Sequence, residues 1–257
     1  DINIYDEGER AYNTTYKYHL AEFGFSDVWY KNLRFGLGLR FEYYKYKDFL
    51  FKKPELTGLD VESEHFLSYF AQVYYSTFDK GYFPSKGTEF KVAYSLYTDN
   101  MAQYNDHAPF SALSGSWASV VPVTRRFSII PSIYGRVLIG KDIAYPLQNA
   151  IGGEVYGLYI PQQLPFAGVT NMELMDNSIM IASVKLRQRM GSIHYLTLTG
   201  NYGLTDSHFF EILKGKQLFG ISAGYGMDSM FGPLEITFGY SNQTDKGSCY
   251  VNLGYYF

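Results

Sequence analysis

Apolar and polar residues alternate with a period of two along most of the chain. In the segment LRFGLGLRFEYYKY, the odd positions from Leu33 to Phe41 are apolar, and the even positions up to Glu42 are arginine, glycine or glutamate. Residues 232–242 and 248–257 repeat this pattern. Successive side chains of a β-strand point to opposite faces, so the alternation predicts strands with one apolar and one polar face.

Eleven strands are predicted in this way, and residues 1–12 have room for a twelfth. The connections at one end are short, as in VTRR and MGSI, whereas longer polar segments at the other end cover 48–64, 101–109, 141–176 and 243–247. The predicted strands cover residues 13–24, 33–47, 65–79, 87–100, 110–122, 127–140, 177–190, 194–205, 216–228, 232–242 and 248–257.

These features predict an all-β fold, an antiparallel transmembrane β-barrel spanning residues 1–257. A soluble β-sandwich also alternates, but the predicted strands of about 10–14 residues exceed the roughly 5–6 that are typical of globular sheets. Short turns at one rim, long loops at the other and aromatic residues near strand ends are typical of outer-membrane barrels. No apolar run is long enough for a transmembrane helix.

Composition narrows the chemistry. The 257 residues include 26 tyrosines and 20 phenylalanines, and the net charge of −3 gives no reason to expect a nucleic-acid partner. Cys249 is the only cysteine, so no intrachain disulfide forms, and the five histidines are scattered without metal-binding spacing. We therefore predict neither a metal site nor a cofactor.

The run GISAG, residues 220–224, matches the G-x-S-x-G pattern of a serine nucleophile. That motif requires a strand, a sharp turn and then a helix. Here the period-two alternation continues straight through Ser222 and is followed by a turn and another strand. We therefore predict that Ser222 belongs to a sheet and that no residue of this chain is catalytic.

Three stretches carry a resemblance to a known superfamily. Residues 75–96 are similar to its D-x-x-x-x-P-x-x-G strand–turn–strand motif, with Asp79, Pro84 and Gly87 at the matching positions of a rim turn. Residues 150–168 resemble its long loop, which folds back into the barrel lumen. The last hairpin is similar to that of the superfamily, whose final strand is an assembly signal, here at Leu253, Tyr255 and Phe257.

This superfamily comprises BamA, TamA and the two-partner-secretion (type V secretion) transporters, also called bacterial surface antigens. Within it, the segments YSLYTDN and PQQLPFAG resemble the barrel of Bacteroidetes patatin-like outer-membrane proteins. The resemblance implies a sixteen-stranded barrel, of which this chain is the C-terminal two-thirds. It also implies a Gram-negative outer membrane, contact with lipid and lipopolysaccharide, and the barrel assembly machinery and other outer-membrane or periplasmic subunits as partners.

The loop at 141–176 is the predicted functional site. Tyr156 stands where the family loop has an arginine that enters the lumen, and Lys185, Arg187 and Arg189 lie on the polar face of the next strand. One interpretation is that this basic ladder lines a solvated lumen; the other is that Glu154 meets Arg187 or Arg189. The loop residues assigned to the lumen are Gly152, Gly153, Glu154, Tyr156, Gly157, Tyr159, Pro165 and Phe166.

The resemblance implies a barrel that anchors a patatin-like lipid hydrolase lying upstream, and that translocates or displays it. A passive porin is an alternative, although a long inward loop argues against a wide lumen. An outer-membrane phospholipase on the barrel wall is a second alternative, but its H-x-S-N-G signature is absent from the sequence.

Overall fold

The computed structural model describes residues 2–6, 9–52, 63–104, 106, 108–154, 160–244 and 247–254. Twelve strands form one antiparallel sheet, hereafter the wall. These strands are β1 (Ile2–Asp6), β2 (Glu9–Tyr30), β3 (Leu33–Lys52), β4 (Glu64–Ser76), β5 (Gly87–Thr98), β6 (Phe110–Pro122), β7 (Phe127–Ile139), β11 (Ser178–Met190), β12 (His194–Asp206), β13 (Lys216–Ser229), β14 (Gly232–Ser241) and β15 (Gly247–Leu253).

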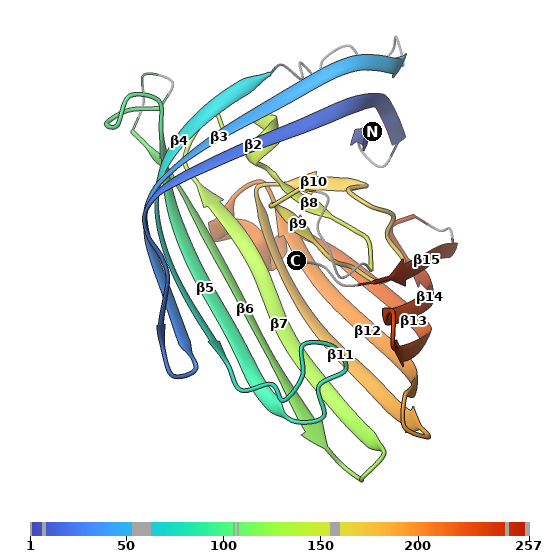
Figure 1. Cartoon of the computed structure of the whole chain (residues 1–257). Coiled ribbons are helices and arrows are strands. Elements are labelled where there is room, and N and C mark those ends of the chain that lie inside the picture. Colours follow the sequence, from blue (N-terminus) through green and yellow to red (C-terminus); the bar gives the residue numbers. More distant parts are fainter. Residues whose placement is uncertain are drawn as a thin grey trace.

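Each wall strand pairs with its neighbours along the chain, apart from one long excursion. β7 pairs with β11, and the residues between them form a separate small sheet. Figure 1 shows the wall curving around this small sheet, with β2 and β3 bending over it. In the described residues, β1 and β15 are the two edges, because β1 pairs with β2 alone and β15 with β14 alone.

The register confirms the predicted alternation of faces. In β12, Leu196 and Leu198 point outward and are 45% and 44% exposed, whereas Thr197 and Thr199 between them point inward and are 8% exposed. The same outer face presents Leu37 of β3. An outward apolar face and an inward polar face are the arrangement that a bilayer around a barrel requires.

The connections follow the predicted asymmetry between the two ends of the wall. Residues 31–32, 77–86, 123–126, 191–193 and 230–231 make the short connections, and this end is hereafter the short-turn rim. The opposite end carries the long segments, including the 3-10 helix η3 (Phe209–Lys214). Among the described residues, no helix is long and apolar enough to cross a membrane.

Two predicted strands are longer in the structure than in the sequence pattern. The strand predicted at 13–24 is β2, which runs from Glu9 to Tyr30, and the next continues to Lys52 instead of ending at 47. Gly24 faces Gly38 across this pair, so two backbones approach at a point where side chains would collide. The room found in residues 1–12 for a twelfth strand is filled by β1.

Candidate functional site: the luminal loop

The connection between β7 and β11, hereafter the luminal loop, has its own secondary structure. It contains the 3-10 helix η2 (Tyr145–Leu147) and the strands β8 (Asn149–Ile151), β9 (Gln163–Leu164) and β10 (Leu174–Asp176). β8 lies between the other two, antiparallel to β10 and parallel to β9. The backbone hydrogen bonds of β8 are therefore made within the loop. Buried backbone groups need such partners.

An apolar cluster holds the luminal loop against the inner face of the wall. The loop contributes Ile151, Phe166 and Val169, and the wall contributes inward-facing residues of β11 and β13. All six side chains in the cluster are at most 1% exposed. The wall members are Ile179, Ile181 and Leu218. Burial of this size seats the predicted Phe166 in the lumen and opposes the release of the loop.

Glycines let the luminal loop fold tightly on itself and approach the wall closely. Gly152 has a φ of +129°, and a Cβ there would lie 1.8 Å from the carbonyl oxygen of Thr170. On the wall, a Cβ at Gly220 would lie 2.1 Å from the carbonyl oxygen of Ala167. A side chain at Gly220 would push the loop away from its seat, and one at Gly152 would separate two segments of the loop itself, so both glycines have a packing function.

Glu154 connects the luminal loop to β13 and β15. The Ser222 hydroxyl donates to Glu154 Oε2 at 2.6 Å, and the Gly168 amide donates to Oε1 at 3.3 Å. Asn252 of β15 donates through Nδ2 to the Glu154 carbonyl oxygen at 2.9 Å. Burial raises the pKa of the Glu154 carboxyl, while the Ser222 hydrogen bond and the charge of Lys185 oppose the rise.

The predicted meeting of Glu154 with Arg187 or Arg189 is corrected here, because the hydrogen bonds of the carboxylate go to Ser222 and Gly168. The Arg187 guanidinium donates to the carbonyl oxygen of Pro84 and lies 5.7 Å from the ring centre of Tyr195. Arg189 donates to the carbonyl oxygen of Arg125 at 3.2 Å. Both groups point toward the short-turn rim, away from the seat.

The third member of the basic ladder lies deeper in the lumen. Lys185 Nζ is 4.0 Å from Glu235 Oε1, and the Lys185 charge also acts favourably on the Glu154 carboxylate. The three residues of the basic ladder therefore lie in two different surroundings. Lys185 belongs to the electrostatics of the loop seat, and Arg187 and Arg189 belong to the rim.

An arginine of the wall clasps the start of the luminal loop. Arg136 of β7 is 9% exposed and donates to the Leu147 carbonyl oxygen at 2.8 Å and to Asn149 Oδ1 at 2.7 Å. Asn149 returns a bond from Nδ2 to the Arg136 carbonyl oxygen at 3.0 Å. The hydrogen bonds therefore satisfy both the Arg136 guanidinium and the Asn149 amide. A buried charge costs little free energy only when it is hydrogen-bonded in this way. The sequence pattern gave no signal for this clasp.

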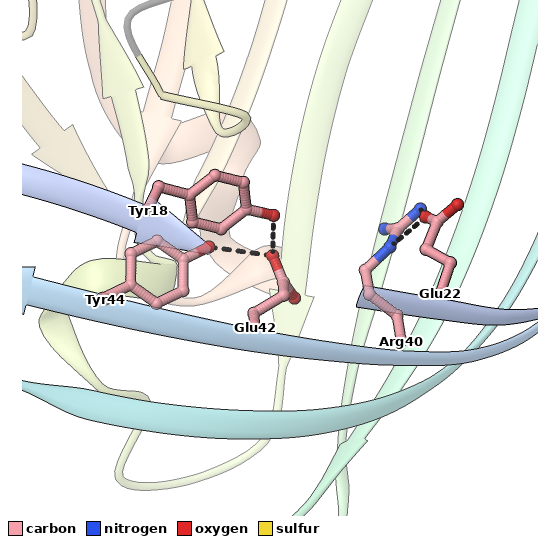
Figure 2. A network of polar contacts seen from close by, with 5 residues as sticks. All are labelled: Tyr18, Glu22, Arg40, Glu42 and Tyr44. Atoms are coloured by element: carbon pink, nitrogen blue, oxygen red, sulfur yellow. Dashed lines mark hydrogen bonds and ion pairs between the residues drawn. The ribbon is translucent and has the colours of Figure 1, made fainter. Parts of the chain in front are cut away.

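The far side of the luminal loop reaches a cluster of tyrosines around a buried carboxylate. Tyr18 and Tyr44 donate to Glu42 Oε1 at 2.8 and 2.9 Å, as Figure 2 shows. Gln162 of the loop donates through Nε2 to the Tyr44 hydroxyl at 2.5 Å. The luminal loop is therefore bonded to β3 near one edge of the wall and to β13 and β15 near the other.

A separate ion pair lies beside this cluster. Arg40 Nη2 is 2.7 Å from Glu22 Oε1, and Figure 2 places the pair next to Glu42 on the same two strands. Both charges are partly exposed, so this pair adds modestly to stability compared with the buried cluster.

The space left in the lumen is divided by the luminal loop. Tyr134 of β7 donates to the Pro165 carbonyl oxygen at 2.7 Å. Cavities of about 660 and 330 Å³ both border this contact. The larger cavity is lined by Arg40, Glu42 and Lys91 among others, and the smaller by Glu154 and Lys185.

The predicted rim turn folds across the short-turn end of the lumen. Asp79 Oδ1 accepts from the Ser85 amide at 2.7 Å, and Gly87 has a φ of +112°. Phe83 is stacked on Tyr195 with ring centres 4.4 Å apart, next to the contact between Pro84 and Arg187. These two contacts fix the turn to β11 and β12.

Several predicted site residues lie outside the described residues. These are Tyr156, Gly157 and Tyr159 of the luminal loop, and Tyr255 and Phe257 of the expected assembly signal. Leu253, the first residue of that signal, lies on β15 with its side chain 69% exposed.

Sequence reasoning missed the polar residues of the wall that hydrogen-bond to the luminal loop and hold it in place. Tyr250 donates to the Val169 carbonyl oxygen at 3.0 Å, and Asn201 accepts from the Ala167 amide at 3.4 Å. Their inward position was visible in the alternation, but their partners were not. Ser222 lies within β13 with its hydroxyl bonded to Glu154, in keeping with a sheet position. The described residues include no group of three metal-ligating side chains.

A curved antiparallel wall with an apolar outer face, a polar inner face and a loop seated inside it defines an outer-membrane β-barrel with a luminal loop. The chain belongs to the OMP85 superfamily, whose family model matches residues 3–257. This membership agrees with the sequence resemblance, and it makes the chain an outer-membrane barrel of the OMP85 type.

A solved structure has a similar fold. It is described as the crystal structure of BamA from Haemophilus ducreyi lacking POTRA domains 1–3, with a TM-score of 0.62 and 11% sequence identity. The match covers 93% of this chain and 53% of that chain, so this chain spans about half the length of the structure that it matches. No curated protein matches the sequence.

Proposed function

We propose that this barrel anchors a linked patatin-like lipid hydrolase in the outer membrane and translocates or displays it, with the luminal loop as the plug. The seated loop carries the part of the proposal that concerns the plug. It buries Phe166 and Ile151 against the wall, bonds to β3, β13 and β15, and divides the lumen into separate cavities. A passive pore keeps a water-filled channel through its lumen, whereas this loop occupies the lumen as a plug.

The link to a hydrolase rests on the resemblance of the YSLYTDN and PQQLPFAG segments to patatin-like outer-membrane proteins of Bacteroidetes. In this proposal the residues of this chain do no chemistry, and the catalytic serine lies in a separate domain. The twelve strands of the wall are part of a sixteen-stranded barrel. Its last strand is recognised by the barrel assembly machinery, and its rims contact lipopolysaccharide and periplasmic subunits.

Labelling of the intact protein with a fluorophosphonate probe tests the hydrolase. We expect one labelled serine, mapped by mass spectrometry to a peptide outside residues 1–257. Label on Ser222 would instead support an enzyme of the barrel wall, and a protein without any labelled serine would contradict the linked hydrolase.

Single-channel recording tests the plug. We expect low conductance from the wild type and a large increase when residues 145–175 are replaced by a short glycine–serine linker. Replacing η3, which lies outside the lumen, with a similar linker is the matched control and should leave the conductance low. A wild type that conducts as well as the loop deletion would favour the passive porin.

A further inference from the structure

A pocket at the short-turn rim is lined by cations from three separate segments. It has a volume of about 410 Å³. It lies between the β4–β5 turn, the β6–β7 turn and the ends of β11 and β12 at the short-turn rim. Its basic residues are Lys80, Lys86, Arg125, Arg126, Arg187 and Arg189. Among the described residues, no carboxylate lines this pocket.

Two carboxylates lie near the pocket, and the six cations outnumber them. Asp79 is held by the Ser85 hydroxyl and by the Ser85 amide at 2.7 Å, within its own turn. Asp228 is 3.8 Å from Lys80, at the edge of ion-pair distance, and both side chains are partly exposed. Like charges that converge in one pocket repel one another, and a bound anion relieves that repulsion.

The pocket also lies where the wall leaves the bilayer. Val121 near the end of β6 and Val123 at the start of the β6–β7 turn are 47% and 55% exposed, so an apolar, lipid-facing surface leads directly to Arg125 and Arg126. Short turns of outer-membrane barrels face the periplasm. The two exposed arginines are therefore at the level of the lipid headgroups in the periplasmic leaflet.

We propose that this pocket binds the phosphate headgroup of an anionic phospholipid from the periplasmic leaflet. Arginine suits this ligand because its planar fork donates two parallel hydrogen bonds to phosphate oxygens. Arg125 and Arg126 receive the headgroup from the membrane side, and Lys80 and Lys86 close the pocket from the turn that folds across the lumen. The assignment is independent of the linked hydrolase, since it requires only that the wall spans the membrane.

Native mass spectrometry of the intact protein tests the site. The protein is exchanged into micelles containing phosphatidylcholine and phosphatidylglycerol, and the retained lipid adducts are counted. We expect the wild type to retain phosphatidylglycerol preferentially. The double variant Arg125→Gln/Arg126→Gln should bind it roughly 25-fold more weakly, since each basic residue near an anionic membrane surface contributes about fivefold. Added salt should weaken the wild-type preference.

The matched control removes two exposed positive charges at the opposite rim, in the variant Lys214→Gln/Lys216→Gln. It should keep the wild-type preference, which excludes a general effect of net charge. Equal loss in both double variants, or no preference in the wild type, would overturn the proposal. A further arm adds inorganic phosphate in phosphatidylcholine alone. Tight phosphate binding without a preference for phosphatidylglycerol would identify a soluble anion and overturn the lipid assignment.

Discussion

At the residue scale, the Glu154 carboxyl makes the seat of the luminal loop sensitive to pH. Burial raises its pKa in the folded protein, so the neutral acid fits the seat better than the carboxylate. A raised folded-state pKa gives stability that is fully present below the ordinary value of about 4.3 and is lost as the pH rises through the raised value.

We therefore predict that amides of the luminal loop exchange hydrogen more slowly in acid, after correction for the intrinsic exchange rate. In Glu154→Gln the side chain is neutral at every pH, and this protection should become independent of pH. The measurement is hydrogen exchange at Gly153 and Gly168 over a pH series. An unchanged slope in the variant would assign the effect to a different group.

The wall glycines give a second test at this scale. Gly220→Ala places a methyl group 2.1 Å from the Ala167 carbonyl oxygen, so the loop must move. We expect a loss of about 1–3 kcal/mol in the free energy of unfolding, which is typical of overpacking. Gly200→Ala is the matched control, since its Cβ meets nothing within 4 Å. Denaturant titration in detergent measures both, and equal effects would rule out the loop contact as the cause.

Single residues also mark the limit of sequence reasoning. The alternation gave the face of Ser222 and of Arg187 correctly, because one polar side chain in two points inward. It could not decide which of them meets Glu154, since that depends on how a loop of more than thirty residues folds against the inner face of the wall. Arg136 was hidden for the same reason, as one arginine among inward-facing residues.

At the scale of the elements, the period of two is a strong signal because each face has its own solvent. Lipid outside and the lumen inside leave little freedom in register, and a slip of one residue would exchange the two faces. The ends of β2 and β3 were the least predictable. Both strands continue past the points where the apolar pattern fades, because their backbones remain paired.

The outer face can be tested on β3 and β14. Leu37→Arg and Ile236→Arg should each cost about 2–4 kcal/mol in the free energy of unfolding, since a charge at the bilayer midplane is poorly solvated. Gln72→Arg is the control, because Gln72 lines the larger luminal cavity. Unfolding of the three variants in lipid bilayers gives the comparison, and a cost at Gln72 equal to that at Leu37 would reverse the assigned faces.

At the scale of the whole molecule, the luminal loop joins parts of the wall that are far apart in strand order. Ser222 and Asn252 hold it to β13 and β15, and Tyr44 holds it to β3 through Gln162. β3 and β13 lie near opposite edges of the twelve-stranded sheet. The loop is thus placed to transmit a change at one edge to the other, provided that it moves as one body.

A double-mutant cycle tests whether the luminal loop is one body. Ser222→Ala removes the donor to Glu154, and Tyr44→Phe removes the hydroxyl shared by Glu42 and Gln162. Each should cost about 1–3 kcal/mol in the free energy of unfolding, because a buried polar partner is left unsatisfied. Separate sites without shared partners usually add within about 0.3–0.5 kcal/mol.

A rigid loop predicts a different result from additivity. Once one seat is lost, the other constrains the loop less, so the double variant should be less destabilised than the sum of the single variants by more than about 0.5 kcal/mol. Cys249→Ser, at an exposed position of β15, serves as a neutral second site and should add to either variant. Simple additivity of Ser222→Ala and Tyr44→Phe would mean that the two seats act independently, and the loop would then be a plug without a mechanical link between the edges.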